Sequence, residues 1–324
     1  NNNPEAVYKI ADLYNVGCEF FDPDPQKCVE YLNQALDIRY PPAIAKYAYL
    51  LLKGDFGVKK DIAKAERIIK MMPNDISNYG EAQYLLSKYY KDKKDIKQYI
   101  KYLILACKND VDDALLDYAL MLLKGIDITA NLPKGMKILK KVADKGFPMA
   151  IYNLGQIYEN GLHAQQKDLK KALDYYKVAA DKGIIPAIVI VAKALFRGRF
   201  DTLDCESDPI QAARLFEYAA SKNDPEGLFW WGTFLNNHSD DTNTSMNELN
   251  RKYGGTPKNI SFALQYYKKA AEAGFVPSML RLGELYNKGV YGERNEALAK
   301  YFYRKGANYG SKEAQDALMY LEGI

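Results

Sequence analysis

Apolar side chains between residues 150 and 187 recur twice with the helical period of about 3.6 residues. The first stripe predicts a helix over 150–160 and consists of Ala150, Leu154, Gly155, Ile157 and Tyr158. The second stripe predicts a helix over 169–181 and consists of Ala172, Tyr175, Tyr176, Ala179 and Ala180. Two such short helices cannot bury their apolar faces alone, so the pair is expected to stack against further pairs.

Glycine and proline residues mark the limits of this helix pair. Gly155 is a poor helix former, and we expect its missing side chain to let a neighbouring helix approach closely. Gly161 and Gly183 are expected to end the two helices, because glycine tolerates a left-handed backbone. Pro186 stands just ahead of the next helix, where its missing N–H costs little. Similar endings recur along the chain, once with Asn223 in place of glycine.

The small residue that opens each unit recurs along the whole chain. Successive units are 32 to 40 residues apart, except for one interval of 51. A fixed period of this length with two helical stripes is typical of a solenoid of helix pairs. The units begin near Ala6, Ala43, Ala82, Ala114, Ala150, Ala187, Gly227 and Ser278, and a partial unit covers 314–324.

The motif AxxxLGxxY followed by KAxxYxxxAAxxG resembles the Sel1-like repeat (SLR), a relative of the tetratricopeptide repeat. Its best copies are Ala150–Tyr158 with Lys171–Gly183 and Ser278–Tyr286 with Glu296–Gly306. The resemblance covers nearly the whole chain and implies an all-α fold, a right-handed superhelical solenoid of about eight helix–turn–helix repeats. We therefore expect residues 1–324 to form a single solenoid domain.

Two regions depart from the repeat. Met71, Met72 and Pro73 replace the Ala-Ala-x-x-Gly ending, so we expect locally irregular packing there. The long interval contains an extra segment, 236–257, rich in Asn, Ser, Thr and Asp. Such a composition cannot bury enough apolar surface to order itself, which predicts a flexible insertion on one edge of the stack.

Tyrosine occurs 27 times, mostly at positions that belong to the repeat. We expect these rings to pack between helices, with the hydroxyl reaching a partner or water, rather than to form a stacking platform for nucleic-acid bases. The positions are Tyr14, Tyr158, Tyr175, Tyr266, Tyr286 and Tyr301.

Composition narrows the possible functions. The formal net charge of +4 is small and dispersed, which argues against nucleic-acid binding. No apolar run is long enough to insert into a membrane, and none resembles a signal peptide. The four cysteines lack paired spacing, which favours a reducing compartment. Cys107 is expected to pack as a small residue, and a Cys18–Cys28 bond is the less favoured alternative to free thiols.

Residues for catalysis or metal binding are sparse. The two histidines, His163 and His238, fall in connectors, and no set of His and Cys has zinc-ligand spacing. Gly254 and Gly255 lack the Lys-Ser/Thr that follows in a P-loop, and no nucleophile stands in a recognisable context. We therefore expect a protein that is not an enzyme, with no catalytic residues, no cofactor and no metal.

By resemblance to tetratricopeptide arrays, the first helix of each pair lines a concave wall. We expect at least four of the apolar wall residues Leu116, Leu120, Leu123, Val189, Phe196 and Phe229 to be partly exposed, as an interaction strip. The alternative is that tight winding buries them against neighbouring helices. The expected partner-binding residues are Leu116, Leu120, Leu123, Tyr152, Gln156, Val189, Lys193, Phe196, Phe229 and Thr233. The same wall includes Tyr8, Asp12, Tyr49, Lys53, Tyr84, Lys88, Leu280 and Glu284.

The resemblance implies a non-catalytic scaffold or adaptor that binds a peptide or partner protein along this groove and recruits or activates another protein. Its expected location is the cytoplasm, at a membrane only through its partner. The alternative is a lumenal or secreted substrate receptor of a protein quality-control complex, in the endoplasmic reticulum. The sequons at Asn237, Asn243 and Asn259 would carry glycans in that compartment, although composition alone explains them. The sequence sets neither the partner nor the oligomeric state.

Overall fold

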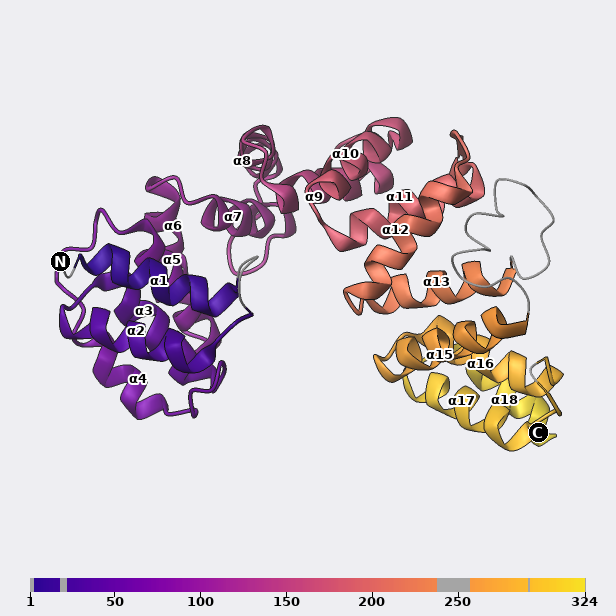
Figure 1. Ribbon diagram of the computed structural model, residues 1–324. Coiled ribbons are helices and arrows are strands. Elements are labelled where there is room, and N and C mark those ends of the chain that lie inside the picture. The colour runs from indigo at the N-terminus through magenta and orange to yellow at the C-terminus, as the bar shows by residue number, and fades with distance from the viewer. Residues whose placement is uncertain (1–2, 18–21, 238–256, 291, 324) are drawn as a thin grey trace. The chain divides into compact units, whose positions relative to one another are not determined.

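The computed structural model describes residues 3–17, 22–237, 257–290 and 292–323. The described residues are mainly helical, and they form two compact units, Asn1–Ala150 and Ile151–Ile324 (Figure 1). Segment 238–256 contains most of the expected insertion and lies outside the described residues, as do Cys18, His238 and Asn243. The observed helix pairs confirm the expected all-α repeat architecture.

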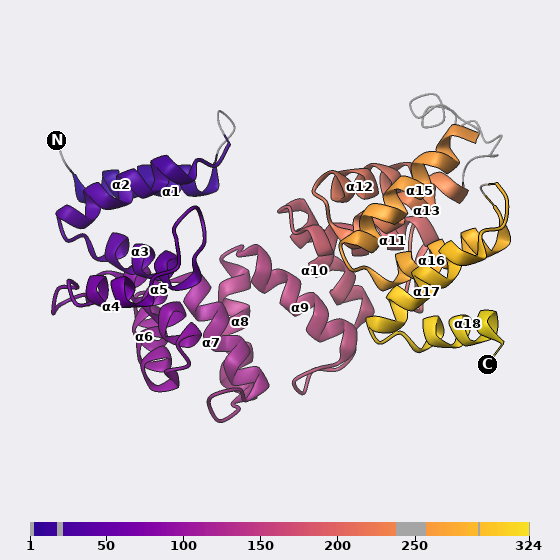
Figure 2. The same cartoon turned by 90° about the horizontal axis from the view of Figure 1, so that it is seen from below.

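The first unit contains four helix pairs that follow one another in chain order (Figure 2). Each helix packs on the next one in sequence within a pair, and α3 also packs on α5. The helices are α1 (Pro4–Val16), α2 (Pro25–Asp37), α3 (Pro41–Lys53), α4 (Ile62–Ile69), α5 (Gly80–Asp92), α6 (Ile96–Lys108), α7 (Asp112–Lys124) and α8 (Leu132–Asp144).

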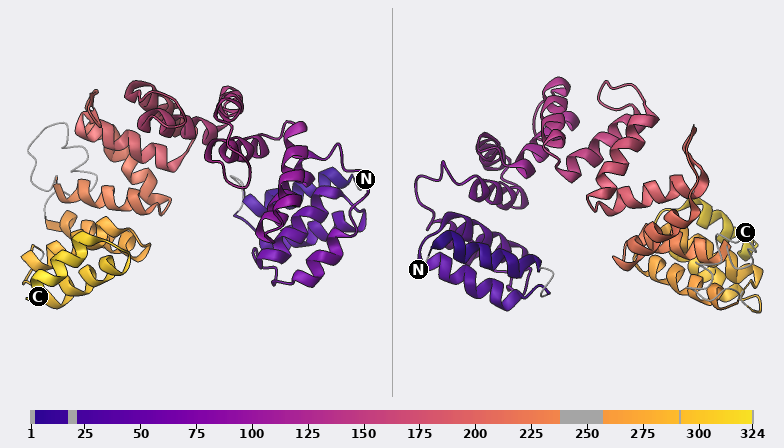
Figure 3. Two further views of the ribbon diagram at one scale, coloured as in Figure 1. Left: turned by 180° about the vertical axis from the view of Figure 1, so that it is seen from behind. Right: turned by 45° about the horizontal axis from the view of Figure 1, so that its top comes forward.

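The second unit continues the same pairing, from magenta to yellow in Figure 3. Helix α9 (Pro148–Asn160) begins at the end of the first unit and belongs mainly to the second. The remaining helices are α10 (Leu169–Asp181), α11 (Ile185–Arg197), α12 (Pro209–Ser221), α13 (Pro225–Asn237), α15 (Pro257–Glu272), α16 (Val276–Lys288), α17 (Glu296–Asn308) and α18 (Lys312–Glu322).

The second helix of most pairs begins at an aspartate or asparagine side chain. Asp61, Asp168 and Asp208 each accept a hydrogen bond from the backbone N–H three residues further on, at 2.8 to 3.0 Å. These caps satisfy one of the donors that the first helical turn leaves open. The repeated acidic or amide residue therefore sets where each second helix starts.

Left-handed residues end the helices, as the sequence predicts. Gly161 follows α9 directly with φ +63°, and Gly183 has φ +84° two residues after the end of α10. Asn223 takes the same role after α12 with φ +57°. Each of these residues reverses the chain so that the next helix can pack back on the previous one.

Gly155 allows α9 and α10 to approach closely, which confirms the sequence-based expectation. A Cβ atom on Gly155 would lie 2.7 Å from Cε1 of Tyr176 in α10, closer than real Cβ contacts. The same arrangement joins Gly283 of α16 to Tyr303 of α17, at 2.5 Å. Tyr176 is fully buried, so the missing side chain of glycine makes room for a large ring in the core of the repeat.

Tyrosine pairs confirm that the repeat tyrosines pack between helices. The rings of Tyr14 and Tyr31 are stacked at 5.6 Å, and those of Tyr158 and Tyr175 are stacked at 5.7 Å. Each stack joins the first helix of a pair to the second. Tyr301 is the exception to the prediction, because it is 56% exposed and its ring meets that of Phe302, a neighbour in the same helix, edge to face.

Two local features interrupt the regular pairs. Helix α4 has only 8 residues and ends at Ile69, which agrees with the irregularity expected there. Pro73 keeps the helix from resuming, because proline disfavours helical backbone in the residue before it. The connector of the sixth repeat forms a minimal antiparallel hairpin, β1 (Arg199–Phe200) with β2 (Leu203–Asp204). This hairpin lies between α11 and α12 and leaves both helices intact.

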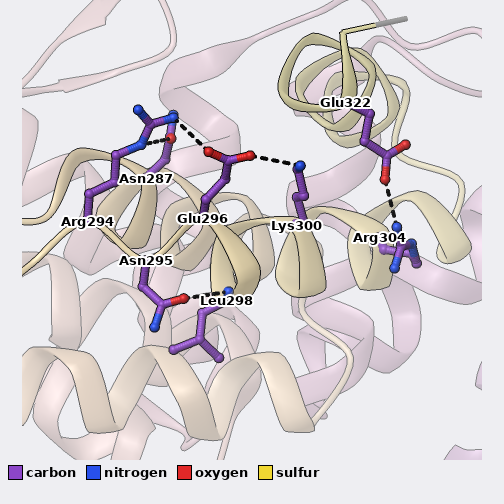
Figure 4. Close-up of polar contacts among 8 residues, drawn as sticks. All are labelled: Asn287, Arg294, Asn295, Glu296, Leu298, Lys300, Arg304 and Glu322. Atoms are coloured by element: carbon purple, nitrogen blue, oxygen red, sulfur yellow. Dashed lines mark hydrogen bonds and ion pairs between the residues drawn. The ribbon is translucent and has the colours of Figure 1, made fainter.

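Polar contacts tie the last helices of the second unit together (Figure 4). Arg304 of α17 forms an ion pair with Glu322 of α18 at 2.7 Å. Glu296 lies between Arg294 and Lys300, at 3.3 and 2.8 Å. Helix α18 thus follows the eighth pair as a further first helix, where the sequence predicts a partial unit.

Candidate partner-binding face

In each unit, we define the first-helix face as the side of the first helices that carries the expected wall positions. These helices are α1, α3, α5 and α7 in the first unit and α9, α11, α13 and α16 in the second. Side chains of consecutive first helices meet on it. In the first unit, Asp12 of α1 forms an ion pair with Lys46 of α3. In the second unit, Lys193 of α11 contacts Glu226 of α13 at 2.8 Å.

Contacts between repeats n and n+2 show on which side the first unit curves. The hydroxyl of Tyr8 in α1 donates a hydrogen bond to the Glu81 carboxylate in α5, two repeats further on. Packed helices are about 8–10 Å apart, so two steps of a straight stack would separate these helices by about 20 Å. The direct contact therefore requires the first helices to lie on the inner side of this unit.

In the first unit, a lysine lies between two tyrosine rings of this face. The Lys88 ammonium is 5.6 Å from the ring centre of Tyr49 and 5.4 Å from that of Tyr84. The Tyr84 hydroxyl donates a hydrogen bond to Asp117 of α7 at 3.0 Å. Burial and then the Asp117 carboxylate raise the pKa of Tyr84, so this hydroxyl stays protonated. The arrangement is a polar, aromatic surface shared by α3, α5 and α7.

In the second unit, Trp230 of α13 contacts side chains of α11, α12 and α13. Its indole N–H donates to Glu226 at 3.3 Å, and its ring lies nearly parallel to that of the fully buried Phe216. The Lys193 ammonium is 5.7 Å from the ring centre, and the Arg197 guanidinium carbon is 4.9 Å from it. The ring of this partly buried tryptophan is thus in cation–π contact with two residues of α11.

Helix α9 adds Tyr152 and Gln156 to the same surface. The Gln156 side-chain amide donates a hydrogen bond to the Tyr152 hydroxyl at 3.2 Å. Burial raises the pKa of Tyr152, and the nearby carboxylates of Glu159 and Glu226 raise it further. Glu226 therefore lies within electrostatic range of α9, although it belongs to a helix two repeats away.

The expected apolar strip is only half present. Leu116, Leu123 and Val189 are buried, at 8%, 3% and 1% exposure, so the prediction that at least four of the six residues are partly exposed is wrong. Leu123 packs against the second helix of its own pair, because a Cβ atom on Gly135 would lie 2.8 Å from its Cγ. Close packing against neighbouring helices buries these three side chains, which is the alternative that the sequence left open.

Leu120, Phe196 and Phe229 remain partly exposed. The two phenylalanines still belong to the aromatic core, because Phe196 contacts Phe216 and Phe234 by its edge. Thr233 donates to the carbonyl oxygen of Phe229 at 2.9 Å and accepts from Tyr267 at 3.2 Å. Both hydrogen bonds of Thr233 are thus made within the fold. Tyr152, Gln156 and Lys193 are partly exposed on the first-helix face.

Sequence reasoning missed Trp230 and Arg197. Trp230 occupies a repeat position that is charged in several other first helices, among them Lys46, Asp117 and Arg281, but not in all of them. A tryptophan at a position that is often charged was the available signal. Arg197 was missed because it ends its helix, beyond the positions taken from the resemblance.

The described ranges contain no group of three or more His, Cys, Asp and Glu side chains placed to hold a metal ion. Within the same ranges, no helix has the length and apolar character needed to cross a membrane. Burial raises the pKa of the Cys107 thiol to about 12, which agrees with the packing role expected for it.

The chain belongs to the Sel1 repeat family. Eight copies of the repeat match residues 4–37, 41–68, 80–111, 112–147, 148–184, 186–224, 250–275 and 276–311. Seven of these matches begin within two residues of a unit start predicted from the small residues. The seventh match, 250–275, covers only the second half of the unit predicted to start at Gly227. Repeats of this family form a typically non-catalytic scaffold that generally serves protein–protein interaction.

Two solved structures share the fold over almost the whole chain. A protective antigen of uropathogenic Escherichia coli with an SLR fold matches with a TM-score of 0.61 at 22% identity, covering 98% of this chain and 64% of its own. A Sel1 repeat protein from Oxalobacter formigenes matches with a TM-score of 0.59 at 18% identity, covering 98% and 86%. At these identities the likeness shows the fold alone.

Two curated relatives come from Schizosaccharomyces pombe. Chitin synthase regulatory factor 3 is 26% identical over 59% of this chain and 24% of its own length. Chitin synthase regulatory factor 2 is 24% identical over 73% of this chain and 40% of its own length. The chain thus spans less than half the length of these relatives.

Proposed function

We propose that this chain is a non-catalytic adaptor that binds a peptide or a partner protein along the first-helix face and thereby recruits or activates that partner. The observation that supports this most is the convergence of side chains from α11 and α13 around Trp230, which leaves a polar, aromatic surface partly open to solvent. Surfaces rich in Trp, Tyr and Arg are typical of binding energy hot spots.

The two yeast relatives support a regulatory role, because their names describe factors that regulate an enzyme. The family's general use in protein–protein interaction supports the same class of function. We propose a cytoplasmic location, with contact to a membrane only through the partner. The lumenal quality-control receptor stays the alternative, and glycans found on the natural protein by mass spectrometry would favour it.

Charge reversal on the two sides of the helix pairs tests the proposal. Partners captured with the full chain are purified. The Kd between each partner and the chain is then measured for the wild type and for two variants of the first-helix face, Lys88→Glu and Lys193→Glu. The matched controls are Lys137→Glu in α8 and Lys177→Glu in α10, which are exposed on second helices. All four substitutions change the net charge equally, and circular dichroism checks that each variant is folded.

We expect at least one first-helix variant to bind about tenfold more weakly, because side chains at the centre of an interface dominate its affinity. Both second-helix controls should bind within about twofold of the wild type. A partner that is lost only in the second-helix variants would contradict the proposal.

A further inference from the structure

We infer that Arg197 and Trp230 form a subsite for a carboxylate of an acidic peptide, with an apolar neighbour of that residue packing on the exposed part of the indole. The inference rests on the proposed function and specifies the chemistry of the partner at the face of the second unit. It follows from three observations. Arg197 has no acidic partner among the described residues, Glu226 is already paired with Lys193, and the Trp230 ring is held in place by its neighbours.

Arg197 is a cation whose hydrogen-bonding edge is open. Its guanidinium lies over the Trp230 ring, and no acidic side chain among the described residues forms an ion pair with it. Stacking occupies the flat face of a guanidinium and leaves its N–H donors directed outward in the plane. Two of these donors match the two oxygens of a carboxylate, which makes the group suited to bidentate recognition.

The carboxylate that contacts the Trp230 indole is already engaged. Glu226 accepts from the Lys193 ammonium at 2.8 Å and from the Trp230 indole N–H at 3.3 Å, through the same oxygen. Lys193 and Glu226 thus offset each other, while the charge of Arg197 remains. The cluster therefore carries a net positive charge and favours an anionic ligand.

The ring that carries Arg197 is held in place before any ligand binds. Phe216 is fully buried and lies at an interplanar angle of 14° to Trp230, and Phe229 contacts the indole by its edge. A platform fixed in this way loses little conformational entropy on binding. One open cation beside one aromatic surface fits an acidic residue next to an apolar one, whereas a nucleic-acid backbone requires a row of cations.

The probe is a pair of fluorescein-labelled ten-residue peptides, one of alternating Glu and Leu and one of alternating Gln and Leu. Fluorescence anisotropy with the full chain gives Kd at low ionic strength. The variants are Arg197→Gln and Arg197→Lys, and the matched control is Arg199→Gln, an exposed arginine of the β1 strand with the same charge. The indole N–H resonances of Trp230 and Trp231 report where the peptide binds.

We expect the Glu-containing peptide to bind at least about tenfold more tightly than the Gln-containing one, and Arg197→Gln to remove that preference. Arg197→Lys should retain part of it, and Arg199→Gln should bind within about twofold of the wild type. The Trp230 resonance should shift, whereas that of Trp231, which is 2% exposed, should not. Glu226→Gln should tighten binding, because it frees the Lys193 ammonium.

Equal affinity for both peptides, no measurable binding to the wild type, or unchanged binding to Arg197→Gln would overturn the subsite. Failure here is distinct from failure of the proposed function. If the captured partner still depends on Lys88 or Lys193 while the Glu-containing peptide ignores Arg197, the adaptor role stands and the acidic specificity is wrong.

Discussion

The Tyr8 hydroxyl hydrogen-bonds to the Glu81 carboxylate across 73 positions of the sequence, from the first repeat to the third. Tyr8 is buried whereas Glu81 is exposed, so the bond lies at the edge of the core. Burial and then the Glu81 charge raise the pKa of the Tyr8 hydroxyl, which keeps it a donor over the whole physiological range. The bond fixes the curvature of the first unit and therefore the spacing of side chains on its inner face.

The first prediction concerns this bond. Tyr8→Phe removes the donor and returns the exposed Glu81 carboxylate to water, which should cost about 1 kcal/mol of local stability. Native-state hydrogen exchange of the full chain should show faster exchange in α1 and α5 and unchanged exchange in α17. Tyr309→Phe, at a tyrosine that is 58% exposed, is the control and should change neither. Equal exchange of α1 in wild type and Tyr8→Phe would show that the bond carries no such role.

The second prediction concerns the close approach of α9 and α10. Gly155→Ala improves helix propensity by about 1 kcal/mol but places a methyl group against Tyr176, and overpacking costs about 1–3 kcal/mol. We expect a lower urea midpoint for this variant. In a Tyr176→Leu background the same substitution should instead raise the midpoint, since the ring is gone. A stabilising effect of Gly155→Ala alone would refute the packing account.

The third prediction concerns the Cys107 thiol, whose pKa burial raises to about 12. An unfolded cysteine titrates near pH 8.5, so at that pH the folded thiol should react with iodoacetamide on the order of a hundredfold more slowly than in guanidinium. Because the folded pKa is raised, the stability contribution is complete below about pH 8.5 and is lost as the pH rises toward 12. Cys107→Ala should flatten this alkaline decline. Fast alkylation of the native thiol would contradict the prediction.

The fourth prediction concerns Asp110, which contacts Lys141 at 2.7 Å and Lys145 at 2.6 Å. Hydrogen bonds from these two lysines lower the pKa of the Asp110 carboxyl. A lowered pKa stabilises the fold above the unfolded value, near pH 3.9, and this contribution is lost as the pH falls through the folded pKa. Asp110→Asn should therefore lower the Tm at pH 7, and the difference should vanish toward pH 3. A difference that is the same at both pH values would argue against an ionic origin.

The repeat fold could be predicted because its determinants are local. The spacing of Gly155, Gly161 and Gly183 sets helix packing and helix ends, and each is visible in a single sequence. The same helix endings recur in most units, so the repeat can be recognised even where one copy departs from it, as at Met71–Pro73. The minimal β-hairpin in the sixth connector escaped prediction, because two paired residues per strand leave no alternating pattern.

The candidate site could be predicted only in part. Tyr84, Lys88 and Lys193 follow from the repeat phase, and the structure brings them to the first-helix face. Leu116 and Val189 share that phase but are buried, because exposure depends on how closely the next helix packs. Trp230 is not one of the wall positions taken from the resemblance to tetratricopeptide arrays. Its contact with Arg197 depends on how two repeats pack together, which the pattern of a single repeat does not encode.

Hydrogen exchange of the full chain with and without a purified partner tests the central claim most directly. The account predicts slower exchange on binding in the first helices, above all α11 and α13, and no change in the second helices α10 and α12. Protection confined to the second helices, with α11 and α13 unchanged, would contradict it.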